Sequence, residues 1–117
     1  MALNLAAIAT ITAKTSVHAN TGTANTIITA PSANTVVKIN SLYAANTGAG
    51  TYTVTVHILR TNPFYIASTV SVATATTTVL ITKDSPIYLE ETTDTLVVVC
   101  AGSTPTVTFV VSYEILA

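Results

Sequence analysis

The residues of this chain that could do chemistry are few and scattered. The histidines are His18 and His57, and the single cysteine is Cys100. Neither histidine has a nucleophile or a second metal ligand at a fixed spacing, so we expect both to be hydrogen-bonded surface or interface residues. Cys100 lies in the apolar run 96–101, where a thiol behaves as a small buried side chain. These residues predict no catalytic site and no enzymatic activity.

The acidic residues gather between positions 84 and 94. Asp84, Glu90, Glu91 and Asp94 could offer oxygen ligands to Ca²⁺, but their spacing matches no EF-hand loop. Adjacent residues of a strand point to opposite faces, so Glu90 and Glu91 do not form a catalytic pair. We expect a solvated turn in which Asp94 accepts hydrogen bonds from backbone amides before the next strand. The sequence therefore predicts no metal and no cofactor.

Aromatic side chains are the other candidates for binding, because flat rings can stack on sugars or fill a protein interface. The candidates are Tyr43, Tyr52, Tyr65, Tyr88, Tyr113 and Phe64, and the chain has no tryptophan. Tyr52 and Tyr113 fall in the apolar registers of their segments, and we expect most of the rings to lie in the core. Phe64 and Tyr65 follow Asn62-Pro63, so they are predicted to be an exposed pair at a turn.

A period of two in the polarity of the sequence predicts the strands that position these side chains. Alternate positions from Tyr52 to Ile58 are apolar, and the positions between them hold threonine or histidine. Residues 106–115 repeat this pattern. Further strands are predicted at residues 26–30, 36–44, 65–72, 78–82, 87–90 and 96–101. Helix signals are almost absent, because β-branched residues dominate.

Turn-forming residues separate these segments at intervals typical of a sandwich. The sequence predicts an all-β protein, an antiparallel β-sandwich or jelly roll of about eight strands, over residues 15–117. Residues 1–14 keep neither a strand nor a helix period and are predicted to be an N-terminal arm. The arm could add a strand to the open edge of a neighbouring subunit. The alternative is that it forms the first strand of its own sheet.

Composition indicates a surface that other proteins cover. Hydrophobic residues make up 50% of the chain and charged residues 8%, against about 25% in ordinary soluble domains. Charges keep a free monomer soluble and protect its sheet edges, so their scarcity favours assembly over a neutral extracellular domain rich in threonine. The net charge is −1, with four scattered basic residues, so nucleic acid is not an expected partner.

The apolar start of the chain does not predict export or membrane insertion. Residues 1–13 hold no lysine or arginine ahead of their apolar run, as a signal peptide requires. No stretch reaches the roughly 20 apolar residues of a membrane span. One cysteine allows no internal disulfide, which fits folding in a reducing cytoplasm.

Four segments carry a resemblance to a known family: ANTII at 24–28, VVKINSLY at 36–43, DSPIYLEE at 84–91 and VVSYEI at 110–115. They resemble the small β-sandwich virion proteins of tailed phages, particularly cyanophages, over roughly residues 15–117. The resemblance implies a capsid decoration (cement) protein, often a homotrimer, that bridges subunits of the major capsid protein or another virion protein. Its location would be the virion, assembled in the host cytoplasm.

The resemblance supplies no functional residue, so the expected interface residues come from local reasoning. They are Leu3, Leu5, Ile8 and Ile11 of the arm, together with Phe64 and Tyr65. Two alternative functions remain: a neck, tail or fibre-associated virion protein, and a glycan-binding or adhesive module. The missing tryptophan counts against the second.

Overall fold

The computed structural model describes residues 7–19, 24–90, 92–101 and 105–117. The described residues form nine strands: β1 (Ile11–Ala19), β2 (Asn25–Ile28), β3 (Val36–Asn46), β4 (Tyr52–Arg60), β5 (Asn62–Val72), β6 (Thr77–Ile81), β7 (Ile87–Leu89), β8 (Thr95–Ala101) and β9 (Val107–Leu116). No helix among them is long and apolar enough to cross a membrane.

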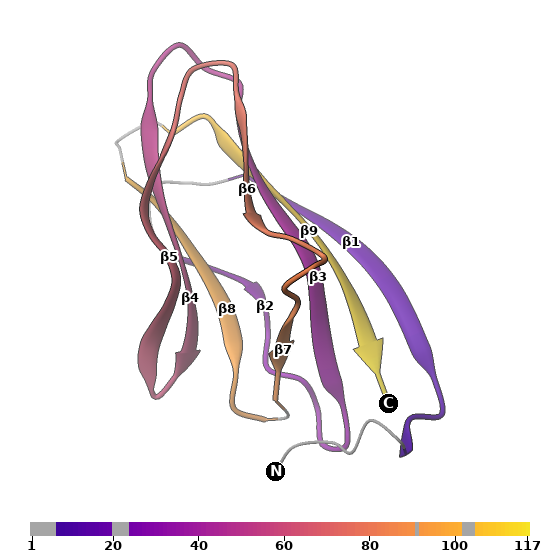
Figure 1. Cartoon of the computed structure of the whole chain (residues 1–117). Coiled ribbons are helices and arrows are strands. Elements are labelled where there is room, and N and C mark those ends of the chain that lie inside the picture. The colour runs from indigo at the N-terminus through magenta and orange to yellow at the C-terminus, as the bar shows by residue number, and fades with distance from the viewer. Residues whose placement is uncertain (1–6, 20–23, 91, 102–104) are drawn as a thin grey trace.

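The strands form two antiparallel sheets that pack face to face (Figure 1). Sheet A has the order β1-β9-β3-β6, and β7 also pairs with β3. Sheet B has the order β2-β8-β4-β5. Strands adjacent in one sheet are mostly distant in the chain, which is the connectivity of a jelly roll. The predicted antiparallel sandwich is confirmed, and β1 brings the described strands to nine instead of about eight.

The core forms where the apolar registers of the two sheets meet. Val54 and Val56 of β4 face inward as the alternation predicts, and Phe109 and Val111 do the same from β9. Cys100 is fully buried beside them, in the inward register of β8. Strands that bury alternate residues stabilise the sandwich chiefly by removing apolar area from water.

A bulge in β3 changes which side chains reach the core. The register of β3 against β9 shifts between Ile39 and Ser41. Because of this extra residue, Leu42 and Ala44 are buried and Tyr43 points outward. Strict alternation would have placed Tyr43 on the same face as Ile39.

Asn46, at the end of β3, ties together three segments at one end of the sandwich. Its buried amide nitrogen donates to the carbonyl oxygens of Gly50 (2.6 Å) and Val72 (3.0 Å). Its amide oxygen accepts from the N–H of Gly48 (3.0 Å) and the hydroxyl of Thr106 (2.7 Å). A Cβ at Gly48 would collide with Thr106, so the loop needs glycine here. A fully satisfied buried amide of this kind fixes the loop geometry.

The described part of the predicted arm lies along its own chain. β1 begins at Ile11, and residues 11–14 pair with residues 113–116 of β9. The N–H groups of Ala9 and Thr10 both donate to the carbonyl oxygen of Ala117 at 2.9 Å. Residues 11–14, placed in the arm by their irregular polarity, therefore belong to the sheet, because backbone pairing needs no apolar period.

Candidate protein interface

Four apolar side chains line up across the outer face of sheet A. The register places Val17 of β1 opposite Val110 of β9, Val110 opposite Tyr43 of β3, and Tyr43 opposite Val79 of β6. Val17, Val79 and Tyr43 are 66%, 49% and 38% exposed, and Val110 is half-buried. We call these four residues the outer row. With neighbouring strands about 4.8 Å apart, the row spans roughly 14 Å.

A hollow of about 500 Å³ lies beside the outer row. Its lining residues are Asn40, Ser41, Tyr43, Val79, Thr82, Lys83 and Asp84. Tyr43 and Val79 supply apolar surface, while Lys83 and Asp84 supply one charge of each sign. Such a site suits an apolar side chain of a partner protein, with polar groups at its margin.

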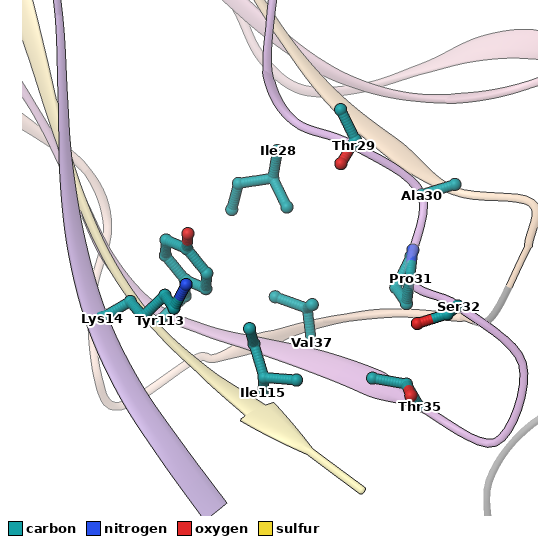
Figure 2. Close-up of a pocket in the computed structure, with 10 residues that line it drawn as sticks. All are labelled: Lys14, Ile28, Thr29, Ala30, Pro31, Ser32, Thr35, Val37, Tyr113 and Ile115. Carbon is teal, nitrogen blue, oxygen red and sulfur yellow. The ribbon is translucent and has the colours of Figure 1, made fainter.

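A second hollow, of about 270 Å³, is lined by residues of β1, β3 and β9 and by the segment that follows β2 (Figure 2). Lys14 and Tyr113 lie close together on the side formed by β1 and β9. The segment from Thr29 to Ser32 forms the opposite side. Lys14 is the only charged residue of the lining.

Phe64 and Tyr65 are exposed, as predicted, but they do not form one surface. They lie within β5 instead of at a turn, so their side chains point to opposite faces of sheet B. Phe64 lies opposite Ile58, whereas Tyr65 lies opposite His57 and meets its ring edge-on, at 5.6 Å between centroids. The two rings cannot act together as a stacking platform.

Ile11, another predicted interface residue, lies apart from this pair. Ile11 is 65% exposed on β1, an edge of sheet A, while β5 is the edge strand of sheet B on the opposite flank (Figure 1). Ile8 is half-buried just before β1. Leu3 and Leu5 lie outside the described residues. The structure therefore does not bring Ile11 together with Phe64 and Tyr65.

The expectation that most aromatic rings lie in the core is wrong in part. Tyr52 and Tyr113 pack against the core as expected. Tyr43 and Tyr88 are exposed, at 38% and 41%, as is the Phe64–Tyr65 pair. For Tyr43 the reason is the bulge in β3, which reverses its side. The sequence shows no signal for that extra residue, and the outer row was missed with it.

The residues that could have carried catalysis are separate and mostly enclosed. Burial raises the pKa of the Cys100 thiol, which disfavours the reactive thiolate. His18 and His57 each keep one buried ring nitrogen without a partner among the described residues, so they are not the fully hydrogen-bonded residues expected. Among the residues that the structure describes, no three histidine, cysteine, aspartate or glutamate side chains lie close enough together to hold a metal ion.

Asp94 is a buried carboxylate that accepts hydrogen bonds from three residues. It accepts the predicted backbone hydrogen bond, from the N–H of Glu90 at 3.0 Å. It also accepts two hydrogen bonds from the Arg60 guanidinium, both at 2.6 Å, and one from the Thr93 hydroxyl at 2.9 Å. The Arg60 hydrogen bonds lower the pKa of the Asp94 carboxyl despite its burial. The sequence did not indicate this pair, because its members are far apart in the chain.

Comparison with known proteins yields only a distant likeness. No family model and no curated protein matches the chain. A solved structure that does match is entitled "Structure of infectious bursal disease virus Gt strain", with a TM-score of 0.43 and 12% identity. The match covers 93% of this chain and 31% of that chain, so this chain spans less than a third of its length.

Proposed function

We propose that this chain is a non-enzymatic structural subunit of a virus particle, and that it binds a protein shell through the outer row. More specifically, we propose a capsid decoration protein of a tailed phage, the family whose sequences it resembles. The observation that carries the proposal is the outer row itself, an aligned apolar strip across four strands with three exposed members. Contiguous apolar surface on a soluble protein marks an interaction site.

A subunit of this kind needs only modest affinity at each place where it binds the shell. Apolar area contributes roughly 25 cal/mol for each Å² removed from water, and association costs consume much of this gain. A scarcity of charge, at 8% of residues, reduces the desolvation that a covered surface would incur. Many copies on a symmetric shell then act together, so weak contacts can stabilise the whole particle.

The alternatives differ in what the outer row would touch. A neck, tail or fibre-associated protein would use the same surface at another position on the particle. A glycan-binding module would need rings on one face, and Phe64 and Tyr65 lie on opposite faces. The outer row favours a protein partner over a sugar.

The location of the chain tests the proposal. Antibodies against the purified chain are applied to virus particles purified from the source of the sequence and are detected by immunogold electron microscopy. Label over the head is expected. Label confined to tails would support the tail alternative and contradict decoration, and particles without label would contradict a virion role.

Matched variants test the outer row as the binding surface. Tyr43→Thr with Val79→Thr removes the ring of Tyr43 and replaces one methyl group of Val79 with a hydroxyl, at two neighbouring positions of the outer row. Leu59→Thr with Tyr65→Thr removes similarly exposed residues from sheet B and serves as the control. The first pair should reduce retention on particles by at least tenfold, while the control pair should leave it unchanged. Equal loss in both pairs would show that the outer row has no special role.

A further inference from the structure

β1 is a long, regular strand whose outer edge has no partner among the described strands. Its nine residues pair with β9 in one unbroken register, from Ile11 opposite Leu116 to Ala19 opposite Thr108. It contains no proline, no glycine and a single charge, Lys14. A strand of this kind leaves a row of N–H and C=O groups free to pair with another strand.

The other sheet edges are less suited than β1 to pairing with a strand of another chain. β2 has four residues, and the outer edge of sheet A opposite β1 is divided between β6 and β7, with five and three residues. β5 is long but carries Pro63, which has no N–H, and its pairing with β4 shifts register twice. Near these shifts Thr69 adopts a φ of 54°. Short strands, proline and bulges all hinder pairing with another chain.

β1 is also accessible from both sides. Seven of its residues are exposed, and only Ser16 and His18 are half-buried. β1 forms the margin of sheet A on the flank away from β5 (Figure 1). A second strand can therefore approach its edge without displacing sheet B.

We propose that two copies of this chain pair antiparallel through their β1 edges, around a two-fold axis perpendicular to sheet A. The pairing would join the two copies of sheet A into one continuous sheet. With this axis, the outer faces of both copies lie on the same side of the joined sheet. Val17 of one copy then lies opposite Ala13 of the other, and Lys14 lies opposite Ser16. The interface is isologous, which is the commonest form of a homodimer.

The sequence of β1 selects one register for this pairing. When Thr15 lies opposite Thr15 of the second copy, all nine residues find partners. A shift that centres the pair on Lys14 shortens the overlap to seven residues and places two ammonium groups directly opposite each other, which is destabilising. A shift by one residue would bring apolar and polar faces together. The Thr15-centred register is thus the one that pairs all nine residues, and in it Lys14 does not lie opposite its own copy.

The second copy is favoured over a different protein because β1 complements itself. Its outward positions hold isoleucine, alanine, threonine, valine and alanine, and the single charge avoids its own copy in the full-length register. The inference stands apart from the proposed function, because the dimer is a property of the purified chain, whereas decoration requires a particle. Either can fail while the other holds.

A cysteine cross-link tests the register. Thr15→Cys places two thiols on opposed residues, with Cα atoms about 4.5–5.5 Å apart, inside the range of a disulfide. Val17→Cys, the control, separates its two thiols by four residues along the strands, roughly 14 Å. Cys100 is fully buried and does not compete. Mild oxidation should convert most of the Thr15→Cys chain into a covalent dimer and almost none of the Val17→Cys chain. Equal yields for the two variants would overturn the pairing.

Native mass tests the association without a covalent bond. The purified chain should show twice its 12.1 kDa mass and dissociate on dilution. Thr15→Lys and Thr15→Glu should each raise the concentration of half-dissociation about fivefold, and mixing the two variants should restore the dimer. The same changes at Ser71, on the edge of β5, should have no effect. A monomer at every concentration, or the trimer that the family resemblance implies, would overturn the inference.

Discussion

β1 and β5 are both long edge strands, but they are held in place by different forces. β5 sends Val72 into the core, and Ile66 and Val70 pack against it. β1 sends no residue into the core, and hydroxyl pairs link it to β9, Thr15 with Ser112 at 3.3 Å and Ser16 with Tyr113 at 3.4 Å. β5 is thus stabilised by packing, whereas β1 is stabilised by its backbone ladder.

This difference separates the part of the molecule that contributes most to folding stability from the part that is available for binding. A packed edge that bends and interrupts its ladder resists further pairing. An unpacked edge with a regular ladder contributes little to the core and remains open. We therefore expect changes on the β5 flank to affect folding stability, and changes on the β1 flank to affect association between copies.

The largest effect that would sharpen this contrast is expected at Asn46, which anchors the end of β5. Asn46→Ala leaves the carbonyl oxygens of Val72 and Gly50 without their buried donor. The free energy of unfolding should fall by about 3 kcal/mol in urea titrations. Thr15→Val on β1, which removes an exposed hydroxyl pair, should change it by less than about 0.5 kcal/mol. Similar losses at both positions would break the comparison.

Valine truncations on the two strands measure packing directly. Val72→Ala removes two fully enclosed methyl groups and should lower the free energy of unfolding by about 2 kcal/mol. Val17→Ala removes the same groups from a side chain that is mostly in water, so its cost should stay below about 0.5 kcal/mol. Thermal unfolding of dilute samples distinguishes the two. A costly Val17→Ala change would show that β1 is packed after all.

Asp94 makes the stability of the β5 side depend on pH, because its partner Arg60 is the last residue of β4, directly before the turn to β5. Asp94→Asn should lower the free energy of unfolding by about 1–2 kcal/mol at neutral pH. The loss is not larger because the Arg60 guanidinium is half-exposed, so water screens the ion pair. The folded carboxyl has a lowered pKa, whereas the unfolded one protonates near pH 4. The stabilisation is therefore complete above about pH 4 and is lost as the pH falls through the lower folded value.

Unfolding of the wild type and the Asp94→Asn variant across this pH range checks the sign. Their free energies should converge in acid. Glu90→Gln, at a half-exposed partner of Arg60, is the control and should change stability by less than about 0.5 kcal/mol. A gap between Asp94→Asn and the wild type that widens in acid would contradict the assigned cause.

The smallest effect is expected on the outer face of β5. Tyr65→Leu keeps an apolar side chain but removes the edge-on contact with His57, and it should cost about 0.5 kcal/mol. Ile11→Val on β1 has no such ring neighbour and should be neutral. A double change with His57→Ala should show that the Tyr65 and His57 losses are not additive.

The sequence predicted the sandwich because its alternating segments cross the core with a strict period. Tyr52 to Ile58 and residues 107–115 show this directly, and both segments face the core as predicted. The period fails at β1, because seven of its nine residues are exposed and none enters the core, so the strand needs no polarity pattern. It also fails at Tyr43, where one extra residue in β3 reverses the faces.

The candidate interface was harder to predict than the fold. The outer row depends on the register between four strands, and no local pattern encodes which residues of distant strands lie side by side. Phe64 and Tyr65 were recognised as exposed, but their position inside β5 decides that they point apart. The Arg60–Asp94 pair likewise required the fold before its members could be joined.

Cys100 gives the chain a built-in reporter of core opening. Its thiol is fully enclosed, and no other cysteine is present in the sequence. A thiol reagent can modify it only when β8 leaves the core, so the rate of modification measures how often the sandwich opens. Comparing that rate in the free chain with the rate in the dimer or on a particle would report how far assembly suppresses those openings.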